Sequence, residues 1–151
     1  FQIILGIATD TMDPTGKIIS KATIPNLTKK SIVEALKKFE GEIKQEPPMY
    51  SALKFNGIPL YKLARRGVVV KRKLRTINIQ SIKLDSFTKN SIDLTVKCGK
   101  GTYIRSLGSD IAKSLKTVGY VSKLIRTRIG NFDENSCIKI NELSKWLSLE
   151  K

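Results

Sequence analysis

The chain has 151 residues, 40% of them hydrophobic and 27% charged, which indicates one globular domain with a buried core and no separate second domain. It contains no histidine, and this excludes Ser-His-Asp and Cys-His catalysis as well as histidine-based zinc sites. Lysine and arginine number 28 against 13 acidic residues, and the net charge of +15 favours a polyanionic partner.

Strand-like and helix-like patterns are interspersed along the chain. Thr28 is a suitable helix N-cap and Gly41 a suitable stop, while two prolines forbid helix in EPPMYSALKFNG. In chain order we expect strands at 2–8 and 17–24 joined by the turn TDTMDPTG, a helix at 29–40, an extended stretch at 46–57, a short helix at 60–66 ended by Gly67, β-rich stretches at 68–72, 74–84 and 91–98, a helix at 105–116, an extended stretch at 123–132, and a final helix at 141–147 capped by Asn141. This order predicts an α+β fold with a mixed, largely antiparallel sheet flanked by helices.

The positive charge is concentrated in one part of the chain. Between Pro47 and Phe132 there are 18 basic and three acidic residues, whereas the remaining residues carry equal numbers of both. Such a stretch indicates nucleic-acid binding, although a basic face that only aids solubility fits the same count. The stretch RRGVVVKRKLR offers Arg65, Arg66 and Lys71 as phosphate contacts, with a merely solvated face as the alternative.

Two other segments combine apolar and basic side chains. In YSALK, an extended backbone places Tyr50 and Lys54 on one face, which suits base stacking and phosphate contact, although Tyr50 fits a core position equally well. In KLIRTR, an extended backbone places Leu124 and Arg126 on one face, a pattern that suits the wall of a binding site. No apolar run is long enough to cross a membrane, and the two cysteines form no CxxC pair, so we expect a cytoplasmic protein.

Few residues could carry catalysis. Asp10 and Asp13 are the one tight acidic pair, and although they could bind a metal or act as acid and base, hydrogen bonds to nearby backbone N–H groups suit a turn better. Arg105 lies in KCGKGTYIRSL, where an arginine at the end of an inward-facing strand must meet a carboxylate, a phosphate or water. The sequence predicts a recognition surface without a complete catalytic site, a metal or a cofactor.

Four stretches of the chain resemble one known family. LGIATDTMDPTG, PPMYSALKFNGIPLYKLARRG, KCGKGTYIRSLGSDIA and LIRTRIGNF are similar, in order, to successive blocks of the bacterial TruB-type tRNA pseudouridine synthases. The resemblance implies a pseudouridine synthase fold and isomerisation of uridine 55 in the T loop of tRNA, without metal or cofactor. The base would be flipped out of the loop, and an aspartate would attack the nucleotide.

The resemblance also implies roles for individual residues. Arg105 matches the arginine that pairs with the catalytic aspartate, Tyr103 matches a pocket tyrosine near the target base, and Leu124 matches the leucine that packs on that base. Tyr50 and Lys54 fall in a block that lies near the RNA stem. Tyr103 and Arg105, two residues apart, would share one face of a strand.

One block of the family has no match. Its catalytic aspartate belongs to a Gly-x-x-Asp-Pro motif upstream of LGIATDT, and Asp10, Asp13 and Asp110 belong to other blocks. We therefore expect residues 1–151 to be the C-terminal part of the catalytic domain, inactive alone, with a bared sheet edge that promotes self-association. Arg105 should then face solvent or a borrowed anion. A non-enzymatic RNA-binding module is the rival interpretation.

Overall fold

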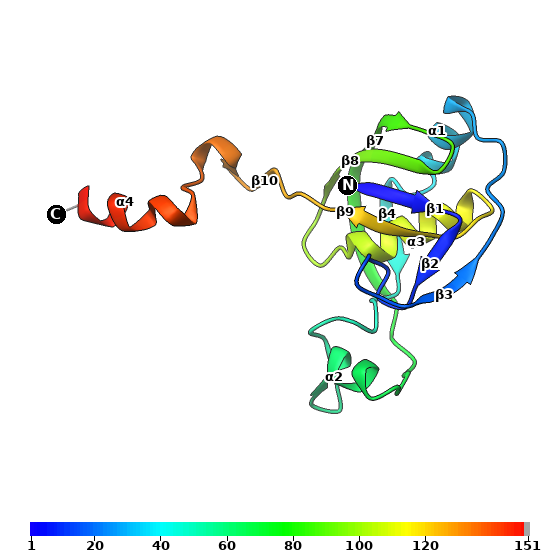
Figure 1. The fold of residues 1–151 in the computed structure, drawn as a ribbon, viewed down its shortest axis with the longest axis horizontal. Coiled ribbons are helices and arrows are strands. Elements are labelled where there is room, and N and C mark those ends of the chain that lie inside the picture. The colour runs from blue at the N-terminus through cyan, green and yellow to red at the C-terminus, as the bar shows by residue number, and fades with distance from the viewer. Residues whose placement is uncertain (150–151) are drawn as a thin grey trace.

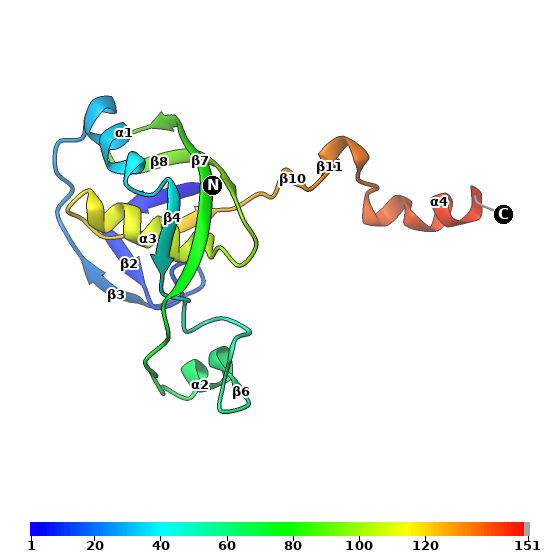
Figure 2. The ribbon, with the colours of Figure 1, turned by 180° about the vertical axis from the view of Figure 1, so that it is seen from behind.

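A computed structural model describes residues 1–149, which form three parts (Figure 1). The body comprises residues 1–45 and 75–123, the arm comprises residues 46–74, and the C-terminal segment comprises residues 124–149. Figures 1 and 2 show, from opposite sides, that the arm and the C-terminal segment project from the body in different directions. No helix among residues 1–149 is long and apolar enough to cross a membrane.

A five-stranded antiparallel sheet forms the body, and its strand order differs from the chain order. The order is β4-β7-β8-β1-β9, with β1 paired to β8 on one side and to β9 on the other. The strands are β1 (Gln2–Leu5), β4 (Gly41–Gln45), β7 (Arg75–Phe87), β8 (Ser91–Cys98) and β9 (Gly119–Lys123). The predicted α+β class is confirmed, and every pairing within this sheet is antiparallel.

Two helices supply the other layer of the core. Helices α1 (Lys29–Lys37) and α3 (Ile104–Ser114) contact each other and pack on β7, β1 and β9. The core side chains include Ile3, Ile32, Ile79, Leu94, Leu107 and Ile111. Gly108 lets α3 approach the sheet closely, because a Cβ there would lie 2.5 Å from the Val121 Cγ2 atom.

Local signals explain where these helices begin and end. Thr28 caps α1 as expected: its hydroxyl accepts from the Ser31 backbone N–H at 3.1 Å, and the Ser31 hydroxyl accepts from the Thr28 N–H at 3.0 Å. Helix α3 begins directly after Tyr103, its N-cap residue. Arg105 is therefore in the first turn of a helix, and the expectation that it ends a strand shared with Tyr103 is wrong, since β8 already ends at Cys98.

A short hairpin crosses the end of the sheet. It consists of β2 (Ile7–Thr9) and β3 (Ile18–Lys21), joined by the turn TDTMDPTG, as the sequence predicts. The strand expected at 2–8 is split at Gly6, whose φ of +85° breaks the extended conformation.

The arm leaves the body after β4 and returns to it at β7. It contains the small hairpin β5 (Lys54–Phe55) and β6 (Ile58–Pro59), followed by helix α2 (Leu60–Arg65) and Gly67, as expected. The β-rich stretch expected at 68–72 is irregular. Its apolar residues lie on the return path of the arm, where no strand runs alongside to supply hydrogen bonds, and Val69 is 77% exposed.

The C-terminal segment contains only short elements. They are β10 (Arg128–Ile129), β11 (Phe132–Asp133), the 3₁₀ turns η1 (Glu134–Ser136) and η2 (Ile140–Glu142), and helix α4 (Leu143–Leu149). The final helix is confirmed, but Asn141 lies within η2 and not at its cap. The extended stretch expected at 123–132 is replaced by the end of β9 and the β10–β11 hairpin.

Candidate functional site

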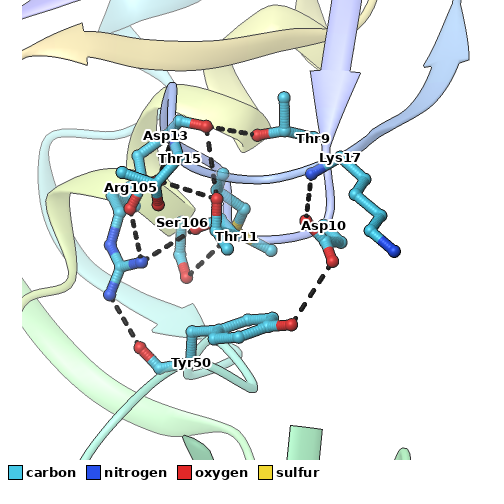
Figure 3. Close-up of polar contacts among 10 residues, drawn as sticks. Thr9, Asp10, Thr11, Asp13, Thr15, Lys17, Tyr50, Arg105 and Ser106 are labelled. Atoms are coloured by element: carbon cyan, nitrogen blue, oxygen red, sulfur yellow. Dashed lines mark hydrogen bonds and ion pairs between the residues drawn. The ribbon is translucent and has the colours of Figure 1, made fainter. Parts of the chain in front are cut away.

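Three segments far apart in the sequence meet at one end of α3. They are the β2–β3 turn, the loop that follows β4 at Tyr50, and the first turn of α3 at Arg105 (Figure 3). The arm leaves the body here, so the same cluster joins the hairpin, the helix and the root of the arm.

The turn is held in shape by threonine and aspartate side chains. The Thr9 hydroxyl donates to the Asp13 carbonyl at 2.7 Å, and the Thr11 hydroxyl donates to Asp13 Oδ1 at 2.7 Å. Asp13 Oδ1 also accepts from the Thr15 backbone N–H at 3.0 Å and from the Thr15 hydroxyl at 2.6 Å. The Met12 carbonyl accepts from the Val121 N–H at 3.1 Å, which ties the turn to β9.

Gly16 makes this compact turn possible. A Cβ at this position would collide with Thr11 Oγ1 and Asp10 Oδ1, and it would lie 2.8 Å from the Thr11 backbone nitrogen. The Asp10 carboxylate closes the turn by accepting from the Lys17 backbone N–H at 2.8 Å. The expectation that both aspartates bond backbone N–H groups of the turn is confirmed.

Arg105 has a carboxylate partner within this chain. Its Nη1 donates to Asp13 Oδ2 at 2.9 Å and to the Thr11 carbonyl at 2.8 Å, and its Nη2 donates to the Tyr50 carbonyl at 2.7 Å. The expectation of an unpaired arginine facing solvent or a borrowed anion is therefore wrong. The turn brings Asp13, 92 residues away in the sequence, against the first turn of α3.

The surroundings of Asp13 favour its ionised form. Partial burial alone would raise the pKa of this carboxyl group, but the hydrogen bonds from Thr15 and Thr11 and the positive charge of Arg105 outweigh burial. The pKa of Asp13 is lowered from its ordinary value of 3.8. The carboxylate is an anion at neutral pH.

Tyr50 links the root of the arm to the same cluster at two points. Its carbonyl accepts from Arg105, and its hydroxyl donates to Asp10 Oδ2 at 3.3 Å (Figure 3). Partial burial and the Asp10 carboxylate raise the pKa of Tyr50 above its ordinary value of 10.0, so its hydroxyl stays protonated and remains a donor.

The backbone of Tyr103 is fixed by a buried glutamine. Gln45 Oε1 accepts from the Tyr103 N–H at 2.8 Å, and Gln45 Nε2 donates to the Tyr103 carbonyl at 3.1 Å. The Ser106 hydroxyl donates to the Glu46 carbonyl at 2.9 Å, one residue further along. These bonds hold the start of α3 against the end of β4, and Tyr103 itself is half-buried, two residues before Arg105.

The arm carries most of the basic candidates. A groove of about 360 Å³ is lined by Lys54 and Lys71 together with the neighbouring cations Arg72, Lys73 and Arg75. Arg72 pairs with Glu46 at 3.0 Å, while Lys54 and Lys71 are exposed. Arg65 lies over the Tyr61 ring, 5.4 Å from its centroid, and Arg66 is exposed at the end of α2.

Leu124 and Arg126 are not bonded to the Arg105 cluster or to the basic residues of the arm within the described part of the chain. Both are exposed just beyond β9, at the start of the C-terminal segment, and 55% of Leu124 is accessible to solvent. Among residues 1–149, no hydrogen bond or ion pair joins either of them to the Arg105 cluster or to the arm.

Sequence comparison identifies the family. The TruB family pseudouridylate synthase N-terminal domain matches residues 1–104, and the tRNA pseudouridylate synthase B C-terminal domain matches residues 105–151. The chain belongs to the TruB family. The resemblance inferred from the four sequence blocks is therefore confirmed.

Individual relatives and structures agree with this TruB assignment. The chain is 49% identical over 148 residues to tRNA pseudouridine synthase B of Francisella philomiragia subsp. philomiragia, and 47% identical to that of Francisella tularensis subsp. tularensis. Each match covers 97% of the chain and 49% of the relative, so the chain spans about half the length of these relatives.

Two solved structures share its fold. A Cbf5-Nop10-Gar1 complex matches with a TM-score of 0.65 and 26% identity, over 98% of this chain and 36% of the other. An H/ACA RNP bound to a substrate RNA containing 2′-deoxyuridine matches with a TM-score of 0.60 and 22% identity, over 98% and 34%.

Two members of this candidate site were missed from the sequence. The sequence assigns Asp13 only to the turn and does not pair it with Arg105. Nothing in the sequence singles out Gln45, which is 2% exposed and bonds only to backbone atoms of Tyr103. Within the described part of the chain, no group of three or more His, Cys, Asp or Glu residues is placed to hold a metal ion.

Proposed function

We propose that these residues serve a tRNA pseudouridine synthase that isomerises uridine in the T loop of tRNA, with the target base flipped out of its stack. The observation that carries the proposal is the placement of Arg105. It is a half-buried cation, held by three hydrogen bonds, at the root of a basic arm in a chain of the TruB family.

In this proposal, Arg105 orients the carboxylate that attacks the nucleotide. A charge-assisted hydrogen bond would fix that carboxylate and favour its ionised form. The family motif for this aspartate, Gly-x-x-Asp-Pro, matches no stretch of the 151 residues. We therefore expect the 151-residue chain alone not to turn over uridine in a T stem-loop, and turnover by the isolated chain would contradict this.

The remaining candidates would hold the RNA. We propose that Tyr103 and Leu124 contact the flipped base, while Tyr50, Lys54, Arg65, Arg66, Lys71 and Arg126 contact the tRNA around it. The groove lined by Lys54 and Lys71 supports the role proposed for the arm, because these exposed lysines form no ion pair among residues 1–149 and can contact phosphate oxygens. The setting we propose for this reaction is the cytoplasm.

Separating turnover from affinity tests these roles. In the complete gene product, Arg105→Ala should lower single-turnover formation of pseudouridine in a T stem-loop RNA by about 100-fold or more. Its affinity for the RNA should change little. Arg65→Ala and Lys71→Ala should weaken RNA binding, and each should reduce the slope of log affinity against log salt by about 1.

Lys37→Ala is the matched control. Lys37 is an exposed lysine on α1, at the end of the body away from the arm (Figure 1). Its loss should change neither turnover nor the salt slope beyond a small long-range effect. If all four variants lowered turnover and affinity in the same proportion, the assigned roles would be wrong. Tight RNA binding without any pseudouridine formation by the complete gene product would favour the rival RNA-binding module.

A further inference from the structure

The arm joins the body through two legs that are held in different ways. The outgoing leg begins at Glu46, whose carbonyl accepts from the Ser106 hydroxyl at 2.9 Å, and it continues through two buried prolines. The returning leg, residues 69–73, makes no hydrogen bond within residues 1–149 and is mostly exposed. Arg72, on this returning leg, reaches back to Glu46, so a polar contact ties the second leg to the first.

The contact between Glu46 and Arg72 is an ion pair with one open side. Arg72 Nη2 lies 3.0 Å from Glu46 Oε1, at the root of the arm, just beyond the last pairing of β4 with β7 at Gln45 and Arg75 (Figure 2). The Arg72 side chain is 18% exposed and the Glu46 side chain 48%. The carboxylate can therefore turn away into water, whereas the guanidinium stays mostly enclosed.

Glu46 is the only acidic residue in the sequence of the arm. Residues 46–74 contain seven lysines and arginines and this one glutamate. Of the seven cations, Arg72 is the only one that is not exposed, and it is the one that Glu46 contacts. The groove that Arg72 lines with four other cations contains no acidic side chain. The single negative charge of the arm is therefore placed on the most enclosed cation of an anion-attracting groove.

The ion pair leaves the donors of Arg72 only partly used. A guanidinium carries five N–H donors, and Glu46 approaches it with one oxygen. The Nε atom of Arg72 is buried and has no hydrogen-bond partner among residues 1–149, which costs free energy. A phosphate group offers several oxygens and can accept two parallel N–H bonds from one guanidinium. Arg72 should therefore bind a phosphate in the groove in preference to Glu46.

We propose that Glu46 is a gate on the arm, which holds Arg72 in the free protein and releases it to a phosphate group that enters the groove. The carboxylate and the phosphate compete for one guanidinium, so the gate weakens the binding of stray anions and keeps the returning leg in place until a ligand arrives. That this phosphate belongs to an RNA backbone rests on the proposed function. The exchange itself is a property of this chain.

Titration of the 151-residue chain with inorganic phosphate tests the exchange. The Nε–H signal of Arg72, followed by nuclear magnetic resonance, should shift saturably with phosphate, and sodium chloride at the same ionic strength should not reproduce the shift. Glu46→Gln removes the charge and keeps the shape of the side chain. It should strengthen phosphate binding by about 3- to 10-fold, because the competing ion pair is lost. Unchanged or weaker phosphate binding in Glu46→Gln would overturn the proposal.

Glu42→Gln is the matched control for this titration. Glu42 is an exposed glutamate on β4 that does not line the groove and forms no ion pair among residues 1–149. Its loss changes the net charge by the same amount, but at about 0.15 M salt the effect on phosphate affinity should be less than about twofold. Equal gains in Glu42→Gln and Glu46→Gln would mean that net charge alone sets the affinity, and the gate would be refuted.

A labelled T stem-loop RNA distinguishes a backbone phosphate from free phosphate. In fluorescence anisotropy with the complete gene product, Glu46→Gln should bind this RNA about 3- to 10-fold more tightly than the wild type. In an Arg72→Gln background, Glu46→Gln should add no more than Glu42→Gln does, because the two residues act as a pair. A full gain without Arg72 would overturn the proposal. Absence of RNA binding by the wild type would instead refute the proposed function, and the phosphate titration would still decide the gate.

Discussion

At the scale of single residues, Asp13 holds the β2–β3 turn and neutralises Arg105 at the same time. One carboxylate oxygen closes the turn, and the other faces the guanidinium across 2.9 Å. The local fold of the hairpin and the position of a charged group on α3 therefore depend on one side chain.

The lowered pKa of Asp13 predicts an acid-sensitive contribution to stability. The folded state holds this carboxyl group ionised below the ordinary value of 3.8, so the unfolded chain binds a proton first as the pH falls. The contribution should be complete above pH 3.8 and be lost as the pH falls through the folded-state pKa. Urea unfolding between pH 7 and pH 3 should show a shallower acid decline for Asp13→Asn than for the wild type.

A variant that leaves every carboxyl group in place serves as the control. Ile111→Val, in the core, should cost about 0.5–1.5 kcal/mol at every pH and keep the acid decline of the wild type. The same acid decline in Asp13→Asn and the wild type would mean that the ion pair does not distinguish the folded from the unfolded chain.

The sequence identified Arg105 and its need for an anion, but not the anion. Motif matching assigned the arginine an aspartate from another block of the family, and Asp13 was assigned to the turn alone. Both assignments relied on the residues next to Arg105 and Asp13 in the sequence. The pairing depends on the hairpin lying across the start of α3, which no local pattern encodes.

At the scale of elements, the Gln45 side chain joins the end of β4 to the start of α3. Gln45 is buried and bonds to both the N–H and the carbonyl of Tyr103, which is the N-cap of the helix. Gln45→Ala should leave the Tyr103 N–H without a partner, while the Tyr103 carbonyl keeps the hydrogen bond from the Leu107 N–H. The variant should lower the free energy of unfolding by about 1–3 kcal/mol.

Gln80→Ala provides the comparison for Gln45→Ala. Gln80 is an exposed glutamine on β7, and its loss should change the free energy of unfolding by less than about 0.5 kcal/mol. Denaturant melts of the two variants measure the difference. Equal effects would mean that Tyr103 finds other partners, such as water, when Gln45 is removed.

Helices and strands marked by caps, glycines or alternating apolar residues were predictable from the sequence. Strands that form mainly by pairing with another strand were not. The capped α1, the helix stopped by Gly67, and β8 follow from caps, glycines and alternation. Strands β4 and β9 were missed, because each is a short sheet edge that is extended mainly by pairing with a longer or central strand. The valines at 68–70 have strand-like composition but no neighbouring strand, so they remain irregular.

At the scale of the whole molecule, exposed apolar residues lie outside the compact body. Ile125, Ile129, Phe132 and Ile140 on the C-terminal segment are all at least 60% exposed. We predict that the 151-residue chain associates with itself through this segment at high concentration. Sedimentation should show a concentration-dependent increase in mass.

Two double variants locate this association. Ile129→Ser combined with Phe132→Ser should abolish it, because these residues pair in the β10–β11 hairpin. Ile18→Ser combined with Ile19→Ser on β3 is the comparison, since these exposed isoleucines belong to the hairpin of the body. Loss of association in the β3 variant alone would place the contact on the hairpin instead.

The strand order of the sheet also determines when the chain can fold during its synthesis on the ribosome. β1 lies between β8 and β9, so Ile3 and Leu5 are synthesised some ninety residues before the first of their neighbours in the sheet. These side chains therefore lack their sheet neighbours while the intervening residues are translated. Pairings so distant in sequence close slowly, because loop closure costs entropy before any contact is gained. On the ribosome, the core of this protein should form only after β9 has left the exit tunnel.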